Sequence, residues 1–379
     1  MEYNFTEEEL SIKDTISKFA KKEIAPFVDQ IEKEGRMPEA LLSKIKALKI
    51  SGLPFHEDLG GAGGTVTSFL LAIEELAYVY LPCTFYPLVN AMAAYGLASF
   101  GSSYLKDKYL KGLLNGTLTG AWAFTEPDTG SDPKQLVTKA VKDNDGWMIN
   151  GVKRFITNSK IADFVVIFAL TDNGVTAFVI ETSTPGYKAG RRETFIAMGS
   201  TDNGDVIVEN VKVTSENVLG EIGKGFDILL AVEAFTKVGS CAGNVGLARS
   251  ALDHAVQYAK EKTHRGTPIG SKFQMTQWNL ASMASKVAAS RAFLYWVAAK
   301  MDKGENVSTE SSLLKMFSSS AARETASEAV QVHGAYGLSK EYQVERLYRE
   351  SRFNEVILGT NEIQRVIAAN ALLRGYHVA

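Results

Sequence analysis

The spacing of hydrophobic residues changes twice along this chain, and these two changes constrain its fold more than any other feature. The first third has helical spacing, the middle has short β-branched and aromatic runs between Gly, Asn and Asp turns, and the remainder is helical again. The pattern predicts an α+β protein with a helical domain at 1–117, a β domain at 118–218 and a second helical domain at 219–379.

The same spacing predicts the individual elements. Thr6 and Glu9 have the spacing of a capping box, which indicates a helix start. The expected helices are 6–22, 38–49, 65–80, 88–100 and 102–114 in the first part and 225–262, 274–303, 309–334, 340–353 and 361–373 in the last. The expected strands are 119–124, 136–141, 164–170, 175–181 and 205–213.

Composition and charge exclude several classes of partner. The chain is 45% hydrophobic and 22% charged, with a formal net charge of −2 and a pI near 6.3, which argues against nucleic acid or an anionic membrane. No apolar run reaches ~18 residues, and the N-terminal MEYNFTEEEL is acidic, so we expect a cytoplasmic location. Cys83 and Cys241 lack metal-ligand spacing, so we expect two buried thiols and no metal site.

Two motifs in the middle of the chain indicate a ligand site. AFTEPDTGSD contains Gly130 and Ser131, whose backbone N–H and hydroxyl groups in a turn suit flavin ring oxygens or the pantetheine arm of a thioester. GVKRFITNSKIAD follows, and it carries an aromatic face at Phe155 and a hydroxyl at Thr157. A hairpin and turn with polar caps would explain either motif alone, but not both at this spacing.

These motifs resemble T-E-P-x-A-G-S-D and N-G-x-K-x-W-I-T-N-G-x-x-A-D of the acyl-CoA dehydrogenase family. Three further stretches, which begin at residues 216, 264 and 329, agree with that family in the same order: ENVLGEIGKGF, HRGTPIGSKFQMTQWNLASM and AVQVHGAYGLSKEYQVERLYRE. The resemblance implies an N-terminal helical domain, a middle β-barrel-like domain and a C-terminal four-helix bundle. It also implies FAD, an acyl-CoA substrate, a homotetramer and an electron-transfer flavoprotein as electron acceptor.

The resemblance assigns a set of residues to FAD. They occupy positions that contact the flavin or its adenine dinucleotide part in the family: Phe124, Thr125, Gly130, Ser131, Phe155, Thr157, Arg265, Phe273, Gln274, Gln331, Gly334, Thr360 and Glu362. The family has an Arg where Lys262 stands here, which leaves Lys262 or Arg265 to replace it. Several of these contacts cross a subunit boundary in the family.

The stretch RESRFNEVILGTNEIQR contains a tight turn, Leu358-Gly359-Thr360, between two expected helices. In the family a Glu before this Gly-Thr removes the α-proton of the thioester. Leu358 stands at that position; it offers its backbone N–H to the thioester carbonyl but cannot accept a proton. Some relatives carry the Glu on the long helix instead, and the matching pair here is Thr236-Lys237.

Three explanations of the missing carboxylate remain open. In the first, Glu233, three residues before Thr236 on the same helix face, is the base for ordinary α,β-dehydrogenation of a short or branched acyl-CoA or an acyl-carrier-protein thioester. In the second, which we rank slightly ahead, a proton further from the carbonyl is removed from a cyclic or already unsaturated acyl-CoA, and the apolar Leu358 suppresses α-deprotonation. In the third, the chain binds flavin or thioester without catalysis.

Substrate contacts follow from the same motifs. Asn90 is the one polar group in 88–94, next to the expected acyl pocket. The candidate substrate-binding residues are Ser131, Asn90, Thr236, Lys237 and Gly359. A different class of function, an oligomeric helical binding protein with no redox chemistry, is excluded if the purified protein shows a flavin spectrum.

Overall fold

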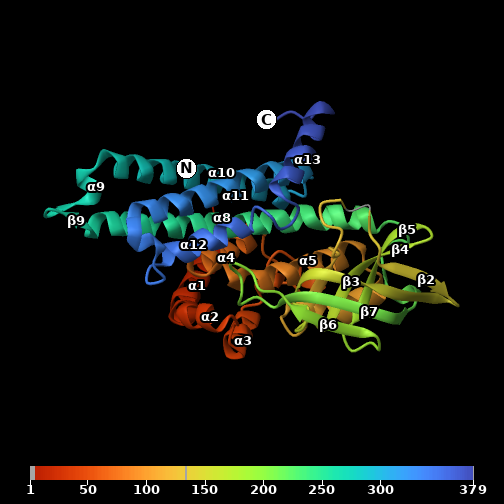
Figure 1. The fold of residues 1–379 in the computed structure, drawn as a ribbon. Helices are drawn as coiled ribbons and strands as arrows, with labels where there is room; N and C mark the ends of the chain where they lie inside the picture. The colour runs from red at the N-terminus through yellow and green to blue at the C-terminus, as the bar shows by residue number, and fades with distance from the viewer. Residues whose placement is uncertain (1–4, 133–134, 379) are drawn as a thin grey trace.

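The computed structural model describes residues 5–132 and 135–378. Figure 1 shows a long central helix, α8 (Gly225–Glu261), with the β domain at one end and the other C-terminal helices alongside. The predicted order of a helical, a β and a helical domain is confirmed. Residues 1–4, which belong to the acidic N-terminal segment discussed above, lie outside the described residues.

The N-terminal domain is helical. Its helices are α1 (Glu7–Phe19), α2 (Val28–Glu34), α3 (Glu39–Ala47), α4 (Val66–Val79), α5 (Phe85–Phe100), α6 (Ser103–Leu105) and α7 (Lys111–Leu114). The predicted capping box is present, because Thr6 Oγ1 accepts from Glu9 N at 3.2 Å and Thr6 N donates to Glu9 Oε2 at 2.9 Å. The single helix expected at 102–114 is interrupted by the π-helical turn Lys106–Leu110.

The middle domain is an eight-stranded mixed sheet. Its strands are β1 (Gly120–Ala123), β2 (Lys139–Asp143), β3 (Gly146–Thr157), β4 (Phe164–Thr171), β5 (Gly174–Glu181), β6 (Tyr187–Arg192), β7 (Asn203–Val213) and β8 (Val218–Leu219). The order is β6-β7-β3-β2-β4-β5-β8, and β1 pairs with β4. β1 and β2 run parallel to β4, whereas the other pairs are antiparallel. The sequence did not predict β3, β6 and β8: polar and charged residues interrupt the alternation of β3 and β6, and β8 is only two residues long.

The C-terminal domain packs along α8. After the small hairpin of β9 (Thr263–His264) and β10 (Thr267–Pro268) come α9 (Ile269–Lys272), α10 (Gln274–Asp302), α11 (Ser308–His333), α12 (Gln343–Phe353) and α13 (Asn361–Leu373). The boundaries predicted for 361–373 agree with α13, and the other long helices agree within a few residues. Both cysteines are buried free thiols, as predicted.

Helix α8 is the core helix of the molecule. Within the described ranges it is the one helix long and apolar enough to cross a membrane by length and composition, but 78% of its most apolar window is buried inside the protein. Small residues on α8 permit close packing: a Cβ on Gly246 would lie 2.2 Å from the Glu74 carbonyl oxygen of α4. At 1.5 Å per residue its 37 residues span about 55 Å, so its two ends lie in different parts of the molecule.

Candidate active site

The flavin-type motif on β3 presents an aromatic face to the outside of the sheet. The pairing of β3 with β7 shifts register between Lys153 and Ile156, and Phe155 in this bulge has φ of +60°. A bulge re-aims the side chain it carries, and Phe155 is 48% exposed. The Arg154 guanidinium lies 5.2 Å from the centre of the Phe155 ring and donates to Glu193 at 2.8 Å.

The structure brings the two middle motifs together through a buried ion pair. Lys153 Nζ donates to Glu126 Oε1 at 2.8 Å and to the Phe124 carbonyl oxygen at 3.1 Å, and both charged side chains are fully buried. Glu126 also accepts from the backbone N–H groups of Val137 and Thr138, at 2.7 and 3.0 Å. The loop that carries Thr125, Gly130 and Ser131 is therefore fastened at its base to β3.

The start of this loop lies directly beside Phe155. Arg154 N donates to the Thr125 carbonyl oxygen at 2.8 Å. Thr125 is partly buried, whereas Gly130 and Ser131 are exposed, and a Cβ on Gly130 would meet nothing closer than Thr125 Cγ2 at 3.9 Å. The loop therefore leaves open space in front of its backbone, where a ligand can approach.

Thr157 and Asn203 form a polar group next to this aromatic face. Asn203 Nδ2 donates to Thr157 Oγ1 at 3.1 Å and to the Phe155 carbonyl oxygen at 3.2 Å. Asn203 Oδ1 is buried without a hydrogen-bond partner among the described residues. The sequence analysis did not select Asn203. Its place at the first residue of β7, paired with Thr157, is the feature that connects it to the site.

Aromatic contacts connect this site to the turn before α13. The rings of Phe155 and Phe195 are 6.0 Å apart between centroids, and those of Phe195 and Phe353 are 5.4 Å apart. Phe353 is the last residue of α12, and the turn follows it. The β3 motif and the turn thus border one region, although they are about 200 residues apart in sequence.

The turn itself has an unusual backbone. Leu358 has φ of +52°, which is rare for a residue other than Gly, and Gly359 has φ of +75°. Gln364 Nε2 donates to the carbonyl oxygens of Leu358 and Gly359 at 3.2 and 3.1 Å. A Cβ on Gly359 would lie 2.6 Å from this Nε2, and the positive φ of Gly359 favours Gly at this position. Thr360 caps α13 by accepting from Ile363 N at 3.4 Å.

One face of α8 meets this turn. Asn244 Oδ1 accepts from Asn354 Nδ2 at 2.5 Å, and Asn244 Nδ2 donates to Ser318 Oγ of α11 at 3.1 Å. Glu233 and Lys237 lie on the same helical face as Asn244, because they precede it by eleven and seven residues. Glu233 and Lys237 therefore lie on the side of α8 from which Asn244 contacts Asn354.

Burial shifts the pKa of both groups toward the uncharged form. Desolvation raises the pKa of the Glu233 carboxyl, and the nearby charge of Lys237 opposes this rise. Desolvation lowers the pKa of the buried Lys237 ammonium, and Glu233 opposes that change. Thr236 is buried as well, but its hydroxyl donates to the Val232 carbonyl oxygen at 2.9 Å within the helix.

A second group of predicted FAD residues lies at the opposite end of the molecule. Tyr258 stacks on His333 at 4.1 Å between ring centroids, which places the end of α11 beside the end of α8. Figure 1 shows this end, with β9 and α9, far from the β domain. The exposed or partly exposed residues at this end are Arg265, Phe273, Gln274, Gln331 and Gly334. One chain therefore does not bring both groups of residues around a single FAD.

Both polar atoms of the Asn90 side chain are hydrogen-bonded to backbone groups within the fold. Its Oδ1 accepts from Gly120 N at 3.0 Å and its Nδ2 donates to the Leu118 carbonyl oxygen at 3.3 Å. Asn90 is fully buried, so its amide fastens α5 to the start of β1. We therefore leave Asn90 out of the substrate site proposed below.

The helical, β and helical arrangement, with a motif for an aromatic-stacked cofactor beside a strained turn, defines a three-domain oxidoreductase fold. The models for the N-terminal, middle and C-terminal domains of acyl-CoA dehydrogenase match residues 6–117, 121–211 and 223–373. The chain is 37% identical to the acyl-CoA dehydrogenase of Bacillus subtilis, over 98% of this chain and 99% of that protein. The chain belongs to the acyl-CoA dehydrogenase family.

Other relatives match along their whole length. The chain is 34% identical to the caffeyl-CoA reductase-Etf complex subunit CarC of Acetobacterium woodii, over 98% of this chain and 99% of that protein. The structure of butyryl-CoA dehydrogenase from Megasphaera elsdenii superposes with a TM-score of 0.96 and 34% identity, over 99% of this chain and 100% of that chain.

Membership of the family makes this chain an FAD-dependent oxidoreductase. The structure has a suitable surface for the flavin, because Phe155 offers an exposed ring and Gly130 leaves open space in front of the loop. Asn203 Oδ1 is a buried acceptor that has no protein donor within the described ranges. When bound, FAD supplies the acceptor for a hydride.

Proposed function

We propose that this chain catalyses the α,β-oxidation, or the reverse reduction, of an acyl-CoA thioester, and that Glu233 exchanges the α-proton in place of the carboxylate missing at Leu358. In the oxidative direction the Glu233 carboxylate would take the α C–H proton, and FAD, held by the residues named below, would supply the acceptor for the β-hydride. The Leu358 N–H then stabilises the charge that develops on the thioester oxygen.

The observation that carries this proposal is the environment of Glu233. Its side chain is half-buried, burial raises the pKa of its carboxyl, and it lies on the helical face of α8 that also carries Asn244, the contact of Asn354. A general acid or base works best with a pKa close to the working pH, and burial moves a carboxyl in that direction. Lys237, one helical turn on, balances the charge when Glu233 is ionised.

In a second candidate function, the apolar side chain of Leu358 determines which proton of the substrate is removed. Leu358 is half-buried and stands where a base would reach the α-carbon. A cyclic or already unsaturated acyl-CoA would then lose a proton further from the carbonyl. The relative that belongs to a caffeyl-CoA reductase complex is named for an unsaturated CoA thioester, which is consistent with this candidate.

We further propose the remaining binding roles and the partners. Phe124, Thr125, Ser131, Phe155 and Thr157 hold the flavin end of FAD. Residues from the far end of a second chain hold its adenine dinucleotide part, together with Thr360 and Glu362, which makes a homotetramer the expected assembly. The relative in a complex named for Etf supports an electron-transfer flavoprotein as the electron partner. A cytoplasmic location accords with a core helix that is mostly buried.

Anaerobic titration of the yellow holoenzyme with a panel of thioesters tests the function. The panel contains straight-chain, branched, cyclohexane and cyclohexene carboxyl-CoA, and the best member also as its acyl-carrier-protein thioester. Loss of flavin absorbance with saturated chains is the expected result. Bleaching by cyclic or unsaturated members alone would favour the second candidate, and no bleaching by any member would indicate a non-catalytic binding subunit.

A further inference from the structure

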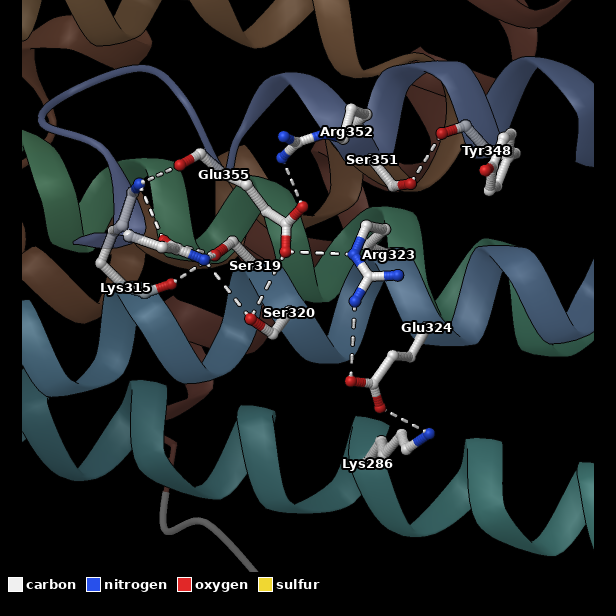
Figure 2. Close-up of polar contacts among 11 residues, drawn as sticks. Lys286, Lys315, Ser319, Ser320, Arg323, Glu324, Tyr348, Ser351, Arg352 and Glu355 are labelled. Atoms are coloured by element: carbon white, nitrogen blue, oxygen red, sulfur yellow. Dashed lines mark hydrogen bonds and ion pairs between the residues drawn. The ribbon is translucent and has the colours of Figure 1, made fainter. Parts of the chain in front are cut away.

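Lys315 on α11 holds the backbone of the turn that contains Leu358. Its Nζ donates to the carbonyl oxygens of Glu355 and Gly359 at 3.1 and 2.9 Å, and to Asn361 Oδ1 at 3.0 Å. Figure 2 shows Lys315 reaching from α11 to this segment, whereas Arg323, further along the same helix, contacts the side chains of Glu355 and Glu324. One side chain thus contacts the segment before the turn, the turn itself and the first residue of α13.

The environment of Lys315 is costly for a charged group. Lys315 is fully buried, and its three acceptors are two backbone carbonyls and an amide rather than carboxylates. Desolvation lowers its pKa to about 8. A buried ammonium without a carboxylate partner lowers the stability of a fold. The hydrogen bonds of Lys315 therefore indicate a role that a neutral side chain could not fill.

The backbone that Lys315 holds contains donors without acceptors. Neither Leu358 N–H nor Gly359 N–H has a hydrogen-bond acceptor in the part of the chain that the structure describes. Backbone donors in proteins are almost always paired, so two such donors in a half-buried turn point to an acceptor that comes from a ligand. The positive φ of Leu358 is a strained backbone conformation, and the contacts of Lys315 (the clamp) help to maintain it.

We propose that Lys315 is a positioning residue that fixes the turn so that the N–H of Leu358 points at the thioester carbonyl oxygen. The Leu358 N–H belongs to the planar Ile357–Leu358 peptide unit, and the carbonyls that Lys315 holds, those of Glu355 and Gly359, lie on either side of this unit, so the clamp restricts how the unit can rotate. Because the group that polarises the thioester carbonyl is a backbone N–H, this arrangement does not depend on the side chain at position 358. This inference rests on the proposed function, since it requires a thioester in this site.

The test measures polarisation of the carbonyl directly. A thioester labelled with ¹³C at the carbonyl is bound to the holoenzyme, and its C=O stretch is followed by isotope-edited infrared spectroscopy. The wild type is expected to lower the stretching frequency, and Lys315→Met to lose most of this shift. The rate of flavin reduction at saturating thioester should fall about 10²-fold, with a smaller change in thioester affinity.

Arg323→Met is the matched control, because it removes a contact to the Glu355 side chain from the same helix but leaves the turn carbonyls held. It should keep the infrared shift. If Lys315→Met does not hold flavin, Lys315→Gln, which keeps a donor in this place, provides the same measurement with an intermediate shift expected. An unchanged infrared shift in the Lys315 variant would overturn the inference, whereas a wild type that neither shifts the carbonyl nor is bleached would overturn the proposed function instead.

Discussion

The Nζ atom of Lys315 lies 2.9 Å from the carbonyl oxygen of Gly359, and this contact joins the middle of α11 to the turn before α13. Figure 2 shows a second group of contacts nearby, in which Glu355 accepts from Arg323 and Arg352. The two groups have different consequences. The Arg contacts hold a side chain, whereas Lys315, together with Gln364, holds the backbone carbonyls of the turn.

Glu233→Gln is expected to lower turnover at least ~10²-fold and to leave flavin content unchanged, because it removes a proton acceptor but keeps the shape of the side chain. Single-turnover flavin reduction measures the change. Glu261→Gln at the far end of the same helix is the control and should retain full activity. Equal rates in wild type and Glu233→Gln would remove Glu233 from the mechanism.

Leu358→Glu in the Glu233→Gln background should restore at least ~10-fold of the lost rate with saturated thioesters, because it returns a carboxylate to the position that the family uses. The left-handed backbone at 358 already accommodates a branched side chain, so the substitution adds no new backbone strain. Flavin reduction by a saturated acyl-CoA is again the readout. A double variant no faster than Glu233→Gln would show that the α-carbon does not lie beside residue 358.

Glu126→Gln should destabilise the fold by about 3 kcal/mol or more and weaken flavin binding, because it leaves the buried Lys153 ammonium without a charged partner. Chemical unfolding and flavin release measure the two effects. The pair Lys188 and Glu209 on the surface is the control, and Glu209→Gln should change stability by less than ~1 kcal/mol. A Glu126→Gln variant as stable as the control would contradict the anchoring role of this pair.

The free energy of unfolding of the wild type, relative to Lys315→Met, should increase between pH 7.5 and pH 9.5 by about 2 kcal/mol. The pKa of Lys315 is lowered from 10.5 to about 8, so the burial cost is complete below pH 8 and disappears as pH rises toward 10.5. The groups that face Lys315 are Lys237 and Cys241 on α8 and Glu355 and Glu362 near the turn. A difference that stays constant with pH would show that Lys315 does not titrate in this window.

Much of the fold was predictable because its helices carry unambiguous local signals. Local sequence patterns indicate the start of α1 at Thr6, the long apolar helix α8 and the start of α13 after Thr360. Strand β3 was not predictable from alternation, because its central residues serve the ligand site rather than the core: Lys153 turns inward to an ion pair, and Phe155 turns outward at a bulge.

The candidate site was predictable only where motifs stand close together in sequence. The contacts of Lys315 with a turn some 40 residues later, and of Asn244 with Asn354, depend on helix packing that no local pattern encodes. Asn90 shows the opposite case, since its polarity indicated a substrate contact but its amide binds backbone groups at the start of the sheet.

Exchange of the α-proton of a bound thioester with solvent tests the role of Glu233 most directly. Saturated acyl-CoA is incubated anaerobically with holoenzyme in D₂O, and deuterium at the α-carbon is measured by mass spectrometry. We predict incorporation with the wild type and with Glu261→Gln, and loss of incorporation with Glu233→Gln. Incorporation at the wild-type rate in Glu233→Gln, or none at the α-carbon in a wild type that is bleached by the same thioester, would contradict the account.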